Sequence, residues 1–408
     1  MATEGGARDA GNDAGRRGDG YGTLRLVFAF IVVADHTPIL TGIGNSFMPA
    51  KSGVDLGAVS VGAFMGLSGY FIMRSWHRDP NLWRFWVRRL LRIMPGLLVV
   101  LTLSALILGT LTTTLGKRAY LAHPATWDYV SHNLLLFPQQ YVLPGVFTAN
   151  PYPSAVNGSL WSLPVELLGY TLIAVLGLLI TFSRFRFVMV VFAVAMAVLL
   201  QRMVIGQITL PPVLLLVPTF PLLQYLGMYA VGAAIWLYRD RLRLSWFGVL
   251  LCVGIDFTLY SSSMVEISRI VTLPYLVIAI GHLLPRRLWL PNWLTVANYG
   301  VYLYGFVVLQ TLIFLGMRMP WLIAVTAVPI ALGLGLISWH LVEKQAMKLR
   351  RVLIRRRRPA PEPQPPADAE PTAESTGAPT AESTGEPAGE PTERMPPVGP
   401  PQHAPASS

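Results

Sequence analysis

Long apolar stretches, separated by short polar segments, dominate the sequence from residue 24 to residue 341. Most of them approach or exceed the ~20 residues that a helix needs to cross a hydrocarbon core of ~30 Å. We expect spans at about residues 24–44, 55–74, 93–115, 160–182, 187–205, 212–237, 247–263, 267–284, 294–316 and 320–341. The pattern predicts an all-α integral membrane protein with about ten transmembrane helices.

The two ends of the chain differ from this pattern. Residues 1–20 are rich in Gly, Asp, Ala and Arg, and residues 359–408 are rich in Pro, Glu, Ala, Ser and Thr. Neither composition can bury enough apolar surface to order the chain. We expect disordered tails around a membrane domain at residues 21–346, which is followed by a basic juxtamembrane segment at residues 347–358. The longest extramembrane segment of the domain is expected at about residues 116–159.

Composition agrees with a membrane protein and argues against a soluble one. Hydrophobic residues make up 53% of the chain and charged residues 13%, against about 25% charged residues in soluble domains. The formal net charge is +11, but the basic residues are grouped between apolar stretches, which is typical of cytoplasmic loops. With the N-terminus inside, 25 of the 32 Lys and Arg residues fall on the inner side and six on the outer side. We expect a multi-pass protein of the plasma (inner) membrane, with both termini cytoplasmic and no nucleic-acid partner.

Metal and disulfide chemistry are not expected. Cys252 is the single cysteine and lies in an apolar stretch, so no intrachain disulfide can form. The sequence has no metal-ligand spacing, no Gly-rich phosphate loop and no nucleophile-elbow motif. We expect no metal and no permanently bound cofactor.

Ionisable residues inside the predicted spans are candidates for functional residues, because burying a charge in a membrane is costly. Arg25 and His36 lie eleven residues apart in the first span, which is close to three helical turns. Their side chains are expected on one helix face, ~16 Å apart along the axis. Glu166 is expected at the depth of His36, where a carboxylate could select one histidine tautomer for use as a base. A structural ion pair is the alternative, and the role of Asp256 in the seventh span stays open.

Arginines cluster at the predicted inner end of the third span. The segment RFWVRRLLRIMPG contains Arg84, Arg88, Arg89 and Arg92. A guanidinium group binds two phosphate oxygens at once, so the cluster predicts an anionic ligand. Anchoring at the membrane surface is the alternative.

Small residues recur in the second span, which reads VGAFMGLSGYFIM. Gly62, Gly66 and Gly69 follow one another at three- and four-residue intervals. This spacing favours close helix packing. The alternative is room for a slender ligand beside the hydroxyl groups of Ser68 and Tyr70.

Six segments together resemble the membrane proteins of acyltransferase family 3. In chain order they read LRLVFAFIVVADH, FMGLSGYFI, FWVRRLLRIMPG, SLWSLPVELLGY, NYGVYLYGF and WHLVEK, within about residues 21–346. The resemblance implies ten core helices and an enzyme that transfers an acetyl or another short acyl group. It implies cytoplasmic acyl-CoA as the donor, and hydroxyl groups of sugars, envelope glycans, glycolipids or sugar-bearing small molecules as acceptors.

Three motifs of this family have matching residues in the sequence. Arg25 and His36 match its Arg-x10-His motif. Arg89 and Arg92 match its R-x-x-R motif, and Glu166 matches the glutamate of its W-S-L-x-x-E motif. These matches imply that the five residues belong to the functional site.

A fourth motif matches in part, and one position differs. Phe64, Ser68 and Gly69 match the family's F-F-x-x-S-G motif, in which Met65 replaces the second Phe. Gly305 stands in the ninth span where the family usually has a histidine. The resemblance therefore implies no polar role for this position here.

The residues and the resemblance lead to one hypothesis for the reaction. His36 is expected to act as general base on an acceptor hydroxyl that arrives from the outer side, with Glu166 orienting or neutralising it. A covalent acyl-histidine is a variant of this hypothesis. The residues expected to bind the acyl-CoA donor are Arg25, Ser68, Gly69, Arg89 and Arg92.

The alternative function is a transporter or flippase for a lipid-linked sugar or a small metabolite. In that case His36, Glu166 and Asp256 would line its pathway. Transporters often have internal repeats, and no convincing repeat relates the two halves of this chain. The pattern therefore favours the enzyme, and the intact pair of Arg25 and His36 argues against an inactive scaffold.

Overall fold

The structure is a computed structural model that describes residues 19–44, 46–48, 55–136, 138–180, 185–215 and 217–353. All of these residues belong to one unit. The predicted tail at residues 359–408 lies outside the described residues, as do residues 1–18 of the predicted N-terminal tail.

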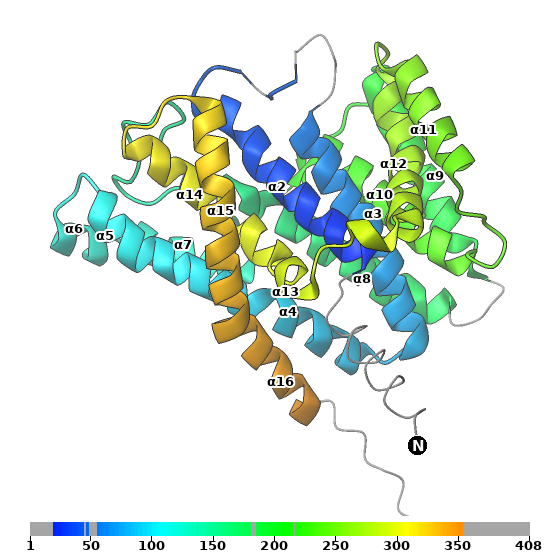
Figure 1. Cartoon of the computed structure of the whole chain (residues 1–408), viewed down its shortest axis with the longest axis horizontal. Coiled ribbons are helices and arrows are strands. Elements are labelled where there is room, and N and C mark those ends of the chain that lie inside the picture. Colours follow the sequence, from blue (N-terminus) through cyan, green and yellow to red (C-terminus); the bar gives the residue numbers. More distant parts are fainter. Residues whose placement is uncertain are drawn as a thin grey trace, which may run out of the picture. The chain divides into compact units, whose positions relative to one another are not determined.

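The described residues are almost entirely helical (Figure 1). In chain order the helices are α2 (Gly20–Leu40), α3 (Leu56–Arg78), α4 (Leu82–Leu103), η2 (Ser104–Leu108), α5 (Gly109–Thr112), α6 (Lys117–Ala122), α7 (Pro124–Leu135), η3 (Gly158–Trp161), α8 (Ser162–Ile180), α9 (Val188–Val204), α10 (Thr219–Leu237), α11 (Trp246–Leu259), α12 (Met264–Leu283), η5 (Arg286–Leu288), α13 (Asn292–Thr295), α14 (Asn298–Phe314), α15 (Pro320–Ser338), η6 (Trp339–Glu343) and α16 (Lys344–Leu353). Two short antiparallel strands, β1 (Val213–Leu214) and β2 (Val217–Pro218), pair before α10.

Seven helical segments of the described chain are long and apolar enough to cross a membrane. They are Gly20–Leu40, Leu56–Arg78, Leu82–Thr112, Gly158–Ile180, Thr219–Leu237, Met264–Leu283 and Pro320–Arg350. Three more predicted spans coincide with the shorter apolar helices α9, α11 and α14. The all-α membrane architecture is thus confirmed, whereas the count of ten spans and the cytoplasmic termini stay predictions.

Helix α2 carries two of the expected site residues, and side-chain hydrogen bonds fix both of its ends. Asp19 caps the N-terminus by accepting a hydrogen bond from the backbone N–H of Gly22, which satisfies one of the free donors of the first turn. Near the other end, the buried carboxylate of Asp35 accepts hydrogen bonds from the Phe47 and Gly57 backbone N–H groups at 3.0 and 2.9 Å. The carboxylate therefore ties α2 to the start of α3.

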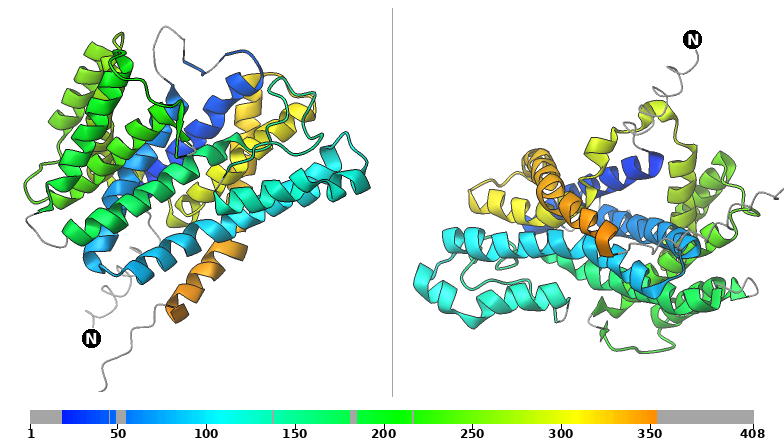
Figure 2. Two further views of the ribbon diagram at one scale, coloured as in Figure 1. Left: turned by 180° about the vertical axis from the view of Figure 1, so that it is seen from behind. Right: turned by 90° about the horizontal axis from the view of Figure 1, so that it is seen from below.

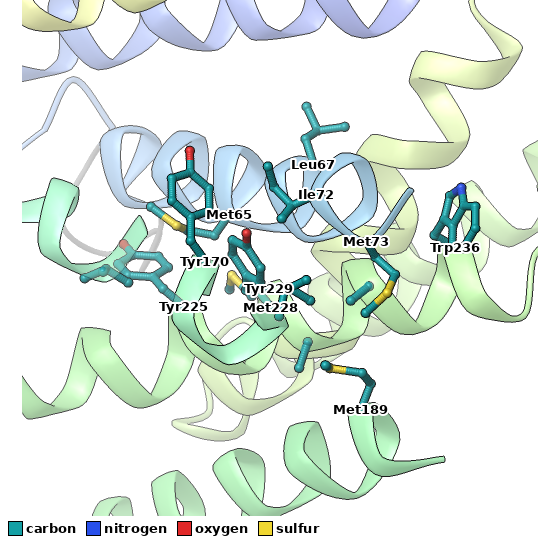
Figure 3. Packing of buried hydrophobic residues seen from close by; sticks show 14 of the residues in the cluster. Met65, Leu67, Ile72, Met73, Tyr170, Met189, Tyr225, Met228, Tyr229 and Trp236 are labelled. Atoms are coloured by element: carbon teal, nitrogen blue, oxygen red, sulfur yellow. The ribbon is translucent and has the colours of Figure 1, made fainter. Parts of the chain in front are cut away.

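The glycines of α3 face other helices. An added Cβ at Gly69 would lie 1.9 Å from the backbone oxygen of Tyr229 in α10, and one at Gly66 would lie 3.0 Å from Pro274 in α12. Figure 3 shows how side chains of α3 and α10, among them Met73 and Tyr229, fill this core. Of the two interpretations of the glycine spacing, the structure supports close helix packing.

Replacing Gly69 with alanine is expected to lower the thermal stability of the protein. The new methyl group would overlap a backbone oxygen, and overpacking of a core costs about 1–3 kcal/mol or more. The matched control is Gly254→Ala in α11, where no atom lies within 4 Å of the added Cβ and alanine favours the helix by up to ~1 kcal/mol. Unfolding of both variants in detergent measures the difference. A Gly69→Ala variant that melts like the wild type would contradict the packing role.

The predicted extramembrane segment at residues 116–159 forms a compact layer with its own core. Helix α7 packs against α4, and both views of Figure 2 show these helices side by side. The buried hydroxyl of Tyr120 in α6 donates a 2.7 Å hydrogen bond to the backbone oxygen of Ala105. Burial raises the pKa of Tyr120 to about 12, so the hydroxyl stays protonated at neutral pH. This bond joins the extramembrane layer to η2, a π-helical turn within the third span.

Candidate functional site

A cavity of about 160 Å³ lies among helices α2, α3, α4, α8 and α14. Its wall contains five of the seven residues expected at the site, namely Arg25, Ser68, Arg89, Arg92 and Glu166. The rest of the wall consists of Val61, Phe64, Met65, Phe71, Ile72, Ile93, Ser162, Leu163, Tyr170, Asn298, Tyr299 and Tyr302. Residues from the first four predicted spans therefore meet around one cavity.

Helix α3 lines the cavity with the face opposite to its glycines. The lining residues run from Val61 to Ile72 at intervals of one to three residues, which places them on one side of a helix. Eleven residues correspond to ~16 Å along the helix axis, the same length that separates Arg25 from His36 on α2. The cavity is therefore a slot with an apolar wall, and the hydroxyl group of Ser68 lies within that wall.

Three guanidinium groups stand at one end of this slot. Arg25 lies over the ring of Phe71, with its guanidinium carbon 4.9 Å from the ring centroid. Arg89 donates a 2.8 Å hydrogen bond to Ser75, and its buried Nε has no partner. Within the described residues, no protein group forms a hydrogen bond or an ion pair with Arg25. Two of the three cations thus keep donors for an anionic ligand.

The arginine cluster of α4 divides into two functional pairs. Arg84 and Arg88 both bind the carboxylate of Asp79, at 3.0 and 2.7 Å. Arg89 and Arg92 line the cavity. The first pair is thus bound to a carboxylate, whereas the interpretation as a site for an anionic ligand remains for the second pair.

Glu343 is a site residue that the motif analysis did not single out. Its buried carboxylate lies 3.1 Å from Arg92 and accepts a 3.3 Å hydrogen bond from Ser338. The residue ends the π-helical turn η6, and such turns are frequent at functional sites. The sequence could have indicated this residue, because Glu343 is the glutamate of the segment WHLVEK and an acidic residue beside an apolar span needs a partner.

Glu166 faces the arginine end and not His36. Its carboxylate accepts a 2.5 Å hydrogen bond from the hydroxyl of Tyr170, and it attracts the guanidinium of Arg25 electrostatically. The described residues contain no hydrogen bond or ion pair between Glu166 and His36. The contact that their similar depths suggested is therefore absent, because one helical turn directs Glu166 onto Tyr170 instead.

A hydrogen bond to the backbone selects the tautomer of His36. Its Nδ1 lies 2.5 Å from the carbonyl oxygen of Val32, and since a carbonyl can only accept, Nδ1 carries the hydrogen. Nε2 is then left with a free lone pair, which is the form that a general base needs. The backbone thus selects the histidine tautomer, which is the role that the sequence suggested for Glu166.

His36 does not belong to the cavity wall. Its ring contacts Phe306 of α14, with the centroids 5.5 Å apart. Tyr302 lies one helical turn before Phe306 and lines the cavity, where its hydroxyl is 2.5 Å from that of Ser162. His36 therefore contacts α14 about one turn, ~5 Å, beyond Tyr302, the residue of this helix that lines the slot.

The remaining expected residues have packing contacts. Gly69, which was expected at the donor site, contacts α10 and is not part of the cavity wall, so the glycine face has no room for a slender ligand. An added Cβ at Gly305 would lie 2.3 Å from a methyl group of Val33, so a histidine does not fit there. Asp256 accepts hydrogen bonds from Ser268 and Thr272 of α12, which accounts for its place in an apolar helix.

Metal-ligating side chains do not cluster in the part of the chain that the structure describes. No group of three or more His, Cys, Asp or Glu side chains could hold a metal ion there.

Known proteins with similar sequences agree with this arrangement. The chain is 29% identical over 324 residues to nodulation protein 10 of Rhizobium leguminosarum bv. viciae, covering 74% of this chain and 85% of that protein. It is 25% identical over 342 residues to the O-acetyl transferase of Shigella phage Sf6, covering 80% and 95%. No solved structure matches the chain. The family model described as an acyltransferase domain matches residues 20–340, and the chain therefore belongs to acyltransferase family 3 and is an acyltransferase.

Proposed function

We propose that the protein transfers an acetyl or another short acyl group from cytoplasmic acyl-CoA to a hydroxyl group. The acceptor class that we propose is a sugar, an envelope glycan, a glycolipid or a sugar-bearing small molecule. The observation that carries the proposal is the slot, which begins among three arginines and ends one turn from His36. The name of the phage relative, an O-acetyl transferase, supports transfer to oxygen.

The arginine end fits the phosphate groups of the donor. Arg25 forms no hydrogen bond or ion pair with a described residue, and Nε of Arg89 has no partner. Both side chains line the slot, and guanidinium groups are well suited to phosphate oxygens. The slot length of ~16 Å suits the slender pantetheine arm. Glu166 would act as a positioning residue here, because its charge compensates Arg25 and its hydrogen bond to Tyr170 fixes the carboxylate.

The transfer itself would take place at His36. Nε2 takes the proton from the acceptor hydroxyl, and the oxygen attacks the thioester carbonyl. The tetrahedral intermediate then expels the CoA thiolate, which receives that proton from the imidazolium. Because His36 lies one turn beyond the slot, the thioester must pass Tyr302 and Phe306, and we propose that these side chains move when the donor binds.

Topology gives a reason for a membrane-bound catalyst. In our proposal the arginine end faces the cytoplasm, where acyl-CoA is made, and His36 faces the outer side of the plasma membrane. The excess of basic residues on the predicted inner side supports this orientation. The acyl group would cross most of the membrane while it is still attached to the donor.

Purified protein incubated with acetyl-CoA labelled in the acetyl group tests the proposal. We expect label to appear in a hydroxyl-bearing sugar acceptor, or slowly in acetate when water replaces the acceptor. A transporter would return the acetyl-CoA unchanged. If acetyl-CoA stays intact in the presence of a broad set of glycan and lipid-linked acceptors, the proposal is refuted.

A further inference from the structure

A second and wider pocket lies next to the arginine end of the slot. It is formed by α13 and the residues on either side of it, by η6 and by the start of α16, and its volume is about 610 Å³, against about 160 Å³ for the slot. Pockets of 300–1,000 Å³ are typical of small-molecule sites. The residues that line it are Pro291, Asn292, Trp293, Val296, Trp339, His340 and Lys344.

Arg92 connects this pocket to the slot. Its guanidinium carbon lies 5.2 Å from the ring centroid of Trp339, which lines the pocket, and 5.6 Å from that of Tyr299, which lines the slot. Val296 of the pocket and Asn298 of the slot are two residues apart at the start of α14. The slot and the pocket therefore lie on either side of the Arg92 guanidinium group.

The pocket offers flat aromatic surfaces and positive charge. Trp293 is 59% exposed, so its indole face is open to a ligand. Lys344 forms no ion pair with any described residue, and His340 uses Nδ1 for a 2.9 Å contact with the Leu336 carbonyl, which leaves Nε2 free. Indole rings stack on nucleobases, and ammonium and guanidinium groups bind phosphate.

We infer that this pocket binds the nucleotide part of acyl-CoA, with the adenine ring against Trp293 and Trp339, the 3′-phosphate at Lys344 and the diphosphate at the arginine end of the slot. The inference rests on the proposed function and adds a site to it. The narrow slot then holds the pantetheine arm and the acyl group, and the wide pocket holds the bulky end. A lipid headgroup is the competing occupant, and the experiment below distinguishes the two.

The test compares two ligands that differ by the nucleotide, namely CoA and 4′-phosphopantetheine. Replacing Trp293 with alanine is expected to weaken CoA binding by about tenfold, the loss of one base–aromatic stack, and to leave phosphopantetheine binding unchanged. The matched control is Trp321→Ala, because Trp321 is equally exposed at 58% and begins α15, at the end of that helix away from η6. Binding is measured by calorimetry on the full-length protein in detergent.

Each outcome has one meaning. If Trp293→Ala binds CoA as tightly as the wild type does, or loses affinity for both ligands equally, the nucleotide site is refuted and the proposed function is untouched. A wild type that binds neither ligand refutes the proposed function itself. If Trp293→Ala keeps its CoA affinity but loses stabilisation by phosphatidylglycerol vesicles, the pocket is a lipid site and the inference is wrong.

Discussion

Replacing His36 with alanine is expected to lower the rate of acyl transfer by about 100- to 10,000-fold, the usual contribution of a general base. Binding of acyl-CoA should hardly change, because Arg25 lies about three turns away on α2, and Arg89 and Arg92 of α4 line the same cavity as Arg25, whose wall does not include His36. The fold should also persist, since the ring makes one hydrogen bond, to the Val32 carbonyl of its own helix. Transfer of labelled acetyl groups and binding of acetyl-CoA are measured on the same preparation.

A second histidine provides the control for this experiment. His282 is exposed near the end of α12 and is far in sequence from every cavity-lining residue. His282→Ala should therefore transfer acyl groups at the wild-type rate. If His36→Ala kept more than a tenth of the wild-type rate at matched expression, His36 would not be the base. Loss of donor binding in His36→Ala would point to a structural role.

Replacing both Arg89 and Arg92 with alanine is expected to weaken acyl-CoA binding by about 100-fold or more. Hydrogen bonds to charged groups contribute about 1.5–3 kcal/mol each, and a free-energy loss of 1.4 kcal/mol corresponds to a tenfold change in affinity. The remaining affinity should respond less to added salt, because fewer charge pairs are left to be screened. Titration with acetyl-CoA at several salt concentrations measures both effects.

Arg84→Ala is the matched control for the arginine pair, because it removes one guanidinium from the same helix. Arg84 forms an ion pair with Asp79, and Asp79 keeps a second ion pair, with Arg88, when Arg84 is removed. The Arg84→Ala variant should therefore have unchanged donor affinity and salt dependence. Equal losses in the control and the double variant would mean that general positive charge attracts the donor. An unchanged affinity in the double variant would refute the donor assignment altogether.

Periodicity was sufficient to predict which side chains share a helix face. A separation of eleven positions from Arg25 to His36, or of three from Arg89 to Arg92, fixes relative directions on a helix whatever surrounds it. For the same reason the apolar stretches predicted the helices, although three of them are shorter than a full span. The convergence of Arg25, Arg89 and Glu166 on one cavity followed from the family resemblance and not from spacing.

Contacts between helices could not be predicted in the same way. The depth of Glu166 was compatible with a partner on α2, but the rotation of α8 about its axis decides between His36 and Tyr170, and no local pattern encodes that rotation. The partner of Arg92 is Glu343, 251 residues away in the chain. The glycines of α3 show the same limit, since their spacing defined a smooth face without showing whether a helix or a ligand covers it.

The two faces of α3 separate stability from selectivity. The glycine face carries the close backbone contacts that hold the helix against α10, whereas Val61, Met65 and Ser68 line the slot. Larger or smaller side chains at these three positions can thus lengthen or shorten the space for an acyl chain without disturbing the glycine contacts. A library of variants for transfer of acyl groups longer than acetyl can therefore be restricted to the slot-lining side of α3.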